Sequence, residues 1–183
     1  MHKKSVIVLV IGSIIIGLIA IYISFLPKLI PITVSQKSSV SISNIKFYLD
    51  TPTNWINWMV QPQNKIEKVQ NVKNQTGTGA VGKWWSESLG DGAIEILTIS
   101  DTSINYQLIS DNNNFRERGK ITFNHFNNDS LTISWFDTLD ISTSLPARWQ
   151  SESIKEHIRY GNSIMLKQLI SNLNEFQKYR KQD

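Results

Sequence analysis

The most prominent pattern in the chain is an uninterrupted apolar run close to its beginning. Residues 5–26 contain no charged side chain, and 17 of these 22 residues are apolar. As an α-helix the run would extend over about 33 Å, because each residue adds about 1.5 Å, and a hydrocarbon core is about 30 Å thick. The pattern therefore predicts a single transmembrane helix.

A cleavable signal peptide is the main alternative interpretation of this run. Its apolar core would span about 7 to 15 residues and end at a small-x-small cleavage site. Here the core is longer, and Ala20 is followed by the bulky Ile21. Lys3 and Lys4 precede the run and only Lys28 closely follows it. An uncleaved signal anchor is favoured, with a cytoplasmic N-terminus and an exported C-terminal domain.

The chain after this run divides into a short linker and one domain. The linker reads Pro-Lys-Leu-Ile-Pro and is expected to be stiff, because proline restricts its own backbone and that of the residue before it. The predicted organisation is a basic flank at 1–4, a transmembrane segment at 5–26, a linker at 27–31, a domain at 32–179 and a tail at 180–183.

The first part of the domain predicts one strand and two small helices. Apolar and polar residues alternate over residues 32–42, as in a half-buried strand. Ser43 is a candidate N-cap for a short helix that extends through Leu49. Pro52 begins a second short helix, whose two tryptophans lie three positions apart on one face.

The middle of the domain alternates with the period of strands. Glycine, asparagine and aspartate clusters separate the segments, and such residues join antiparallel neighbours by short turns. A series of hairpins is therefore predicted. The expected strands span residues 65–73, 81–88, 93–100, 103–110, 116–126 and 130–140.

Helical spacing returns near the C-terminus. Residues 146–148 are predicted to begin a helical turn that leads into a segment at 152–159. Gly161 is expected to separate this segment from a long amphipathic helix at 162–179. The element order predicts an α+β fold in which an antiparallel sheet of six or seven strands packs on the last helix.

Charge and composition narrow the classes of partner. The 183 residues have a formal net charge of +4, but residues 27–183 hold all 15 acidic and 17 of the 19 basic residues, so the domain carries only +2. This weak and dispersed excess argues against nucleic-acid binding. The absence of cysteine excludes disulfides and any cysteine-based metal or redox site.

A glycine-rich segment resembles a nucleotide-binding motif. Residues 77–83 read Gly-Thr-Gly-Ala-Val-Gly-Lys, which satisfies the G-x-G-x-x-G spacing and the start of a P-loop. A P-loop requires a helix after the glycines and a Ser or Thr hydroxyl for magnesium. Here Trp84 occupies the hydroxyl position and the following residues have a strand pattern. A hairpin turn is predicted, and no nucleotide.

Four motifs, taken in order, resemble the SRPBCC superfamily of polyketide cyclase/dehydrase-like and START-like proteins. Residues 52–58 are similar to its Pro-x-x-Trp-x-x-Trp segment. Residues 79–85 are similar to its glycine turn before an aromatic strand. Residues 90–97 resemble its Gly-x-Gly-x-Ile-x-Ile strand, and residues 103–106 the tyrosine-bearing strand that follows. The element order also resembles the helix-grip fold of this superfamily.

The resemblance implies a curved sheet that grips the long helix around a deep, mostly apolar cavity for lipids, sterols, polyketides or similar molecules. It carries over no catalytic residue, because active members share no catalytic motif. No cofactor or metal is predicted. The residues expected to line the ligand pocket are Trp58, Trp85, Tyr106, Phe123, Trp135, Met165 and Leu169.

Several of these aromatic residues have a simpler interpretation as core. Consecutive residues of a strand point to opposite faces, so only one of Trp84 and Trp85 can enter the cavity or core. Trp135 shares a face with Leu131 and Ile133 and is expected between the sheet and the last helix. Core and pocket lining remain open for all of them, because apolar pockets use the same residue types.

Few side chains suggest acid–base chemistry. His125 and His157 are assigned to the surface, because neither has a carboxylate and a second ligand at a suitable spacing. Asp137 and Asp140 are the only acidic pair near the expected cavity. If one of them faced inward, desolvation would raise its pKa, although such residues more often end a strand in solvent.

Together these features predict a membrane-anchored protein that binds a hydrophobic or lipid-like small molecule without defined catalysis. One alternative is a cyclase, dehydratase or hydrolase that acts on a hydrophobic substrate in the same cavity. Converging polar groups would favour this enzyme, and a wholly apolar lining would favour a carrier. Another alternative is a partner-docking domain without ligand, whose cavity would be filled and whose aromatic patch would face outward.

Overall fold

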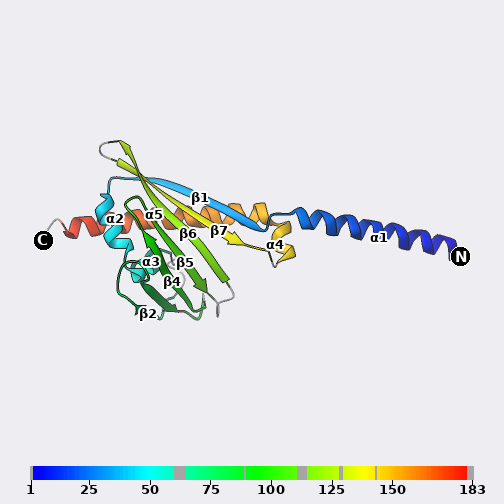
Figure 1. The fold of residues 1–183 in the computed structure, drawn as a ribbon, viewed down its shortest axis with the longest axis horizontal. Helices are drawn as coiled ribbons and strands as arrows, with labels where there is room; N and C mark the ends of the chain where they lie inside the picture. Colours follow the sequence, from blue (N-terminus) through cyan, green and yellow to red (C-terminus); the bar gives the residue numbers. More distant parts are fainter. Residues whose placement is uncertain are drawn as a thin grey trace.

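The computed structural model of the protein describes residues 2–59, 65–88, 90–110, 115–127, 130–142 and 144–180. An N-terminal helix, α1 (His2–Phe25), leads into one α+β domain (Figure 1). The domain consists of one antiparallel sheet, two small helices and a long C-terminal helix preceded by a short one. This architecture confirms the α+β class that the hydrophobic pattern predicts.

The sheet has seven strands in the order β1-β7-β6-β5-β4-β3-β2, and all neighbours are antiparallel. Consecutive strands from β2 to β7 are therefore neighbours, as expected for hairpins. The strands are β1 (Leu29–Ser38), β2 (Lys68–Lys73), β3 (Val81–Trp85), β4 (Gly92–Ile99), β5 (Ser103–Ser110), β6 (Phe115–Asn127) and β7 (Ser130–Asp140).

The first strand begins earlier than predicted. β1 starts at Leu29, inside the segment interpreted as a linker, and pairs with β7 along its whole length. Ile30 faces Leu139 across this pair and is buried, which explains why the prolines on either side do not keep the segment free of the sheet. Pro31 is tolerated because β1 is an edge strand, where a missing N–H leaves no ladder bond unmade.

The two small helices lie between β1 and β2. Helix α2 (Ile42–Leu49) starts two residues earlier than expected, because Ser41 rather than Ser43 is its N-cap and accepts a hydrogen bond from the backbone N–H of Asn44. Helix α3 (Pro52–Met59) begins at its proline as predicted. Trp55 and Trp58 of α3 are fully buried, as their shared face requires.

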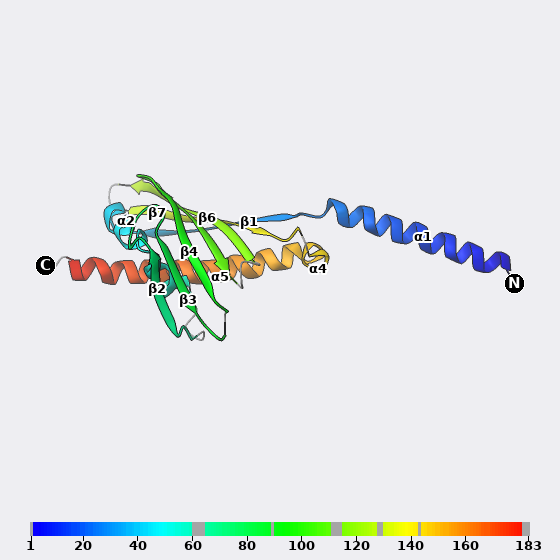
Figure 2. The same ribbon diagram turned by 60° about the horizontal axis from the view of Figure 1, so that its bottom comes forward.

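The C-terminal helix α5 (Ser151–Arg180) is continuous over 30 residues, so the predicted separation at Gly161 is wrong. A single glycine costs a helix only about 1 kcal/mol, and packing on both sides of the position offsets this cost. Leu166, Leu169 and Leu173 of α5 are fully buried against the sheet. Figures 1 and 2 show α5 running along one face of the sheet, which curves around it.

The short helix α4 (Leu145–Trp149) contacts the C-terminal end of α1 through its side chains. The Arg148 guanidinium donates hydrogen bonds to the carbonyl oxygens of Ile23, Ser24 and Leu26 at 2.6 to 3.1 Å. Ile23 and Ser24 belong to the last turn of α1 and Leu26 follows it, at the end where the helix dipole favours a cation. Arg148 therefore caps α1 from the domain.

Helix α1 points away from the sheet (Figure 1). Over the residues that the structure describes, no helix is both long enough and apolar enough to cross a membrane. The transmembrane helix predicted at 5–26 is thus not supported by the structure.

Candidate functional site

A partly enclosed pocket of about 260 Å³ lies between α3, the inner face of the sheet and α5. Most of its surface is apolar, and two polar side chains from different elements reach it. The lining residues are Ile56, Met59, Trp84, Ile94, Leu108, Glu117, Trp135, Ile158, Asn162 and Met165. This mixture of an apolar wall and a few placed polar groups is typical of a small-molecule site.

The tryptophan pair on β3 divides between the two faces of the sheet. Trp84 is buried, lines the pocket and donates its indole N–H to the Gly90 carbonyl at 3.1 Å. Its ring covers Gly92, directly opposite on β4, where no Cβ could be accommodated. Trp85 is on the other face, with the Lys68 ammonium 4.9 Å from its ring centre. The inward residue is therefore Trp84.

Three residues aligned across the sheet form the polar end of the site. Tyr106 on β5 faces Gly119 on β6, and Gly119 faces Asp137 on β7. A Cβ at Gly119 would collide with both the Tyr106 hydroxyl and the Asp137 carboxylate. Glycine at this position therefore leaves the space in which the side chains of β5 and β7 meet over β6.

Asp137 is the acceptor at the centre of a buried hydrogen-bond network. It receives hydrogen bonds from the Tyr106 hydroxyl, from the Trp135 indole N–H at 3.0 Å and from the Asn162 amide at 2.8 Å. The indole of Trp135 also donates to the Tyr106 oxygen at 2.6 Å. Asp137 is 3% exposed, so protein donors replace the water that would otherwise solvate its carboxylate.

Glu117 adds a second carboxyl group, which lines the pocket and hydrogen-bonds to Asp137. Burial raises the pKa of Glu117 to about 9, and the neighbouring negative charge of Asp137 and their hydrogen bond add to the effect. Glu117 is consequently protonated at neutral pH. It presents a neutral carboxylic acid to the pocket.

Burial also raises the pKa of Asp137, while the hydrogen bonds from Tyr106, Glu117, Trp135 and Asn162 act in the opposite direction. Two carboxyl groups this close do not both ionise, so the pair retains one proton at neutral pH. Because Asp137 has several donors around it, the charge is best stabilised there and the proton on Glu117. Tyr106 is fully buried and its pKa lies well above its ordinary value, mainly through desolvation.

Six of the seven residues predicted to line the pocket lie in its wall or in the core around it, and Trp85 does not. Trp135 and Met165 line the pocket. Trp85 belongs to the opposite face of the sheet, where strand alternation places it once Trp84 is inward. The other four are fully buried in the core that surrounds the pocket: Trp58, Tyr106, Phe123 and Leu169.

Glu117 and Asn162 are the polar pocket residues that sequence reasoning missed, and several apolar lining residues, such as Ile56, were missed as well. Strand alternation could have found Glu117, because it is four and six residues before the inward Ile121 and Phe123. Asp137 is likewise two residues beyond the inward Trp135, and it fulfils the condition set for an inward carboxyl in this region. Asp140, by contrast, is exposed and accepts a hydrogen bond from the Ser142 N–H.

The remaining candidates for chemistry lie elsewhere. Gly77 and Gly79 form a turn with positive φ before β3, and Gly82 lies within that strand against Pro52, so no helix follows the glycines. His125 and His157 are exposed. Within the described part of the chain, no group of three or more histidine and carboxylate side chains is placed to hold a metal ion.

Comparisons with known proteins identify the fold. No protein-family model matches the chain, and no curated protein matches it. Among solved structures, norcoclaurine synthase from Thalictrum flavum has a TM-score of 0.59 at 11% identity, over 79% of this chain and 93% of that one. Ara h 8.0201 has a TM-score of 0.55 at 13% identity, over 80% and 99% of the two chains. The KanY protein has a TM-score of 0.58 at 9% identity, over 79% and 97%.

These structures are similar to this chain over about four fifths of its length, at identities that carry information about the fold alone. One of them is named as an enzyme, so the fold by itself does not decide between binding and catalysis. The domain of this protein has a helix-grip fold.

Proposed function

We propose that the domain binds a small hydrophobic or amphipathic molecule in the pocket between the sheet and α5. The observation that carries this proposal is the pocket itself: about 260 Å³, mostly apolar, with Glu117 and Asn162 at its surface. A core that served stability alone would be filled, because empty volume costs packing energy. The open pocket also argues against a partner-docking domain without ligand, because such a domain was expected to have a filled cavity.

A pocket-filling variant tests this function. Native mass spectrometry of the full chain released from detergent is expected to show a bound small molecule. Met165→Trp should abolish the extra mass, because Met165 lines the pocket. Ile164→Trp is the matched control, since Ile164 is next to Met165 on α5 but is 42% exposed. Absence of any bound molecule from the wild-type protein, or its retention in Met165→Trp, would contradict the proposal.

We also propose that residues 5–26 hold the domain at a membrane as a single-pass anchor, with the domain on the exported side. Large apolar side chains between Ile7 and Phe25 are exposed along α1. The uncharged run in the sequence has 22 residues, which supports the anchor.

The carboxyl pair supports a second candidate, an enzyme that transfers protons on a hydrophobic substrate. Glu117 can donate its proton to a substrate carbonyl oxygen in the pocket, and the carboxylate that this leaves can accept the proton from the adjacent carbon, so that an enol forms and Glu117 is protonated again. Deuterium exchange next to the carbonyl of 2-hexanone, followed by NMR in D2O, measures this activity. Exchange that depends on Glu117, lost in Glu117→Gln but kept in Asp140→Asn, would favour the enzyme over a carrier.

A further inference from the structure

The pocket contains a buried negative charge with no cation beside it. Glu117 and Asp137 share one proton, so the pair carries a net charge of about −1 at neutral pH. None of the ion pairs among the described side chains includes either residue. The groups that face the pair are instead neutral: Tyr106 from β5, Trp135 from β7 and Asn162 from α5.

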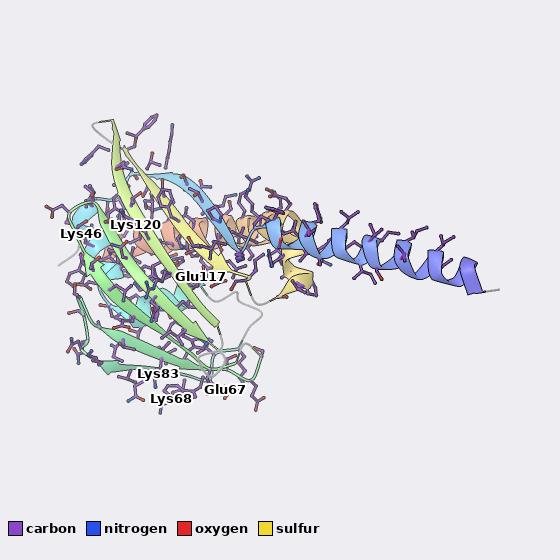
Figure 3. All side chains as sticks on the ribbon, turned by 45° about the vertical axis from the view of Figure 1, so that its right-hand side comes forward. Lys46, Glu67, Lys68, Lys83, Glu117 and Lys120 are labelled. Atoms are coloured by element: carbon purple, nitrogen blue, oxygen red, sulfur yellow. The ribbon has the colours of Figure 1, made fainter. Side chains whose placement is uncertain are left out.

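The nearest basic residues whose side chains the structure describes are exposed or engaged elsewhere. Arg118 and Lys120 follow Glu117 on β6 but are exposed, and Arg118 donates to Gln107. On α5, Arg159 pairs with Glu156 at 2.8 Å on the helix surface. Figure 3 shows Glu117 well apart from the lysines of β2 and β3, which occupy the far edge of the sheet. No described cation of the protein therefore balances the pair.

We propose that this uncompensated charge selects the head group of the ligand: the pocket takes amphiphiles with a cationic amine and rejects those with a carboxylate. The inference rests on the proposed ligand-binding function and names the chemical class of its ligand. An isolated charge in an apolar site is strongly unfavourable, and an incoming ammonium group compensates it, whereas a carboxylate adds a like charge.

The lining fits such a head group. Glu117 reaches the pocket surface with Asp137 behind it, so an ammonium that hydrogen-bonds to Glu117 lies close to both carboxyl groups. The faces of Trp84 and Trp135 also attract a cation when water is excluded. The side chains of Met59, Ile94 and Leu108 offer an apolar wall for a short hydrocarbon tail.

Binding of an amine has a consequence for protons. The ammonium favours the ionised form of Glu117, so the proton held between the two carboxyl groups is released to solvent as the complex forms. A neutral alcohol of the same length does not cause this release. Proton release thus separates recognition by the pair from simple burial of the hydrocarbon tail.

Three ligands with the same tail test the inference on the full chain in a non-ionic detergent: hexylamine, hexanol and hexanoate at pH 7. Isothermal titration calorimetry in two buffers of different ionisation enthalpy measures affinity and proton release together. Hexylamine is expected to bind at least about tenfold more tightly than hexanoate and to release up to one proton. Hexanol should bind with intermediate affinity and release none.

Variants assign the preference to the pair. Asp137→Asn should make the affinities for hexylamine and hexanol similar, because the remaining Glu117 is neutral. Glu117→Gln should abolish proton release while the charge on Asp137 keeps hexanoate excluded. Asp140→Asn, an exposed carboxylate on the same strand, is the control and should behave as the wild type.

The outcomes separate the two proposals. If hexanoate binds as tightly as hexylamine, the inference on the head group is wrong and the ligand-binding function stands. The same conclusion follows if Asp137→Asn folds and retains the full preference. If none of the three ligands binds the wild-type protein, both proposals fail.

Discussion

At the scale of single residues, the site depends on a carboxyl group that stays protonated. Glu117 is in a mostly apolar wall next to Asp137, and its pKa rises to about 9 for that reason. In the unfolded chain the same residue has an ordinary pKa near 4.5. Between these two values the unfolded state releases a proton that the folded state retains, so ionisation favours unfolding as the pH rises.

We therefore predict that the free energy of unfolding falls from pH 5 to pH 9, with a contribution from Glu117 of at most about 1.4 kcal/mol per pH unit. Glu117→Gln should flatten this dependence, because the amide keeps the shape and cannot ionise. Urea unfolding followed by tryptophan fluorescence at pH 5, 7 and 9 measures it. Asp140→Asn should leave the slope unchanged, and equal slopes in the wild type and Glu117→Gln would contradict the assignment.

Gly119 allows the polar network to form, because its missing side chain gives Tyr106 and Asp137 room to meet. We predict that Gly119→Ala destabilises the fold by about 1 to 3 kcal/mol, as overpacking in a core does. Thermal unfolding measured by circular dichroism tests this. Substitution to alanine without loss of stability would show that the network can move aside.

At the scale of elements, α5 shows how packing overrides a local signal. Gly161 has no positive φ, and a Cβ there would meet no neighbour within 4 Å. We predict that Gly161→Ala stabilises the protein by about 0.5 to 1 kcal/mol through higher helix propensity. Equilibrium unfolding in urea measures the change.

Gly82 on β3 provides the opposite case. A Cβ at this position would lie 2.9 Å from the Cβ of Pro52, at the start of α3. The expected result for Gly82→Ala is a loss of stability in the same urea experiment, because the helix and the strand would have to separate. If Gly161→Ala and Gly82→Ala shifted stability in the same direction, the account of both glycines would be wrong.

The junction between α1 and α4 depends mainly on Arg148. Its guanidinium holds the last carbonyls of α1, and Trp149 makes an edge-to-face contact with Tyr22 at 5.7 Å. We predict that Arg148→Met loosens this junction and that trypsin cleaves after Lys28 several-fold faster. Arg159→Met, which removes an exposed ion pair on α5, is the control. Equal cleavage rates in both variants would show that the cap does not restrain the junction.

At the scale of the whole molecule, the proposed anchor would hold the domain at a lipid surface. We predict that the full chain floats with liposomes in a density gradient, and that two arginines introduced at Ile15 and Leu18 abolish flotation. A charged residue at the centre of a span costs about 2.5 to 3.5 kcal/mol on the insertion scale. Phe126→Arg, at an exposed site on β6, is the control. Flotation of the double variant would contradict the anchor.

Much of the fold follows from patterns that are local in sequence. The alternation of apolar residues, the turn residues between strands and the helical spacing near the C-terminus predicted the element order and the α+β class. The ends of the helices and strands were less predictable. Strand β1 extends into the expected linker because Ile30 is buried where β1 pairs with β7, and α5 continues through Gly161. Such boundaries depend on contacts with distant segments.

The candidate site was predictable only in part. Trp135 and Met165, two of the seven residues predicted for a ligand site, line the pocket, and Asp137 faces inward as alternation along β7 allows. The partnership of Glu117 with Asp137 could not be read from the chain, because it depends on the register between β6 and β7 and on Gly119 between them.

The sequence by itself determined the sheet-and-helix architecture, the apolar inner faces and the uncharged N-terminal run, because each depends on the period or composition of a continuous segment. The tertiary structure decided that Trp84 rather than Trp85 faces the pocket, that Arg148 caps α1, and that two carboxyl groups share a proton. Those features require side chains from distant segments to come into contact, in part at buried positions, and only the folded chain creates that proximity and that burial.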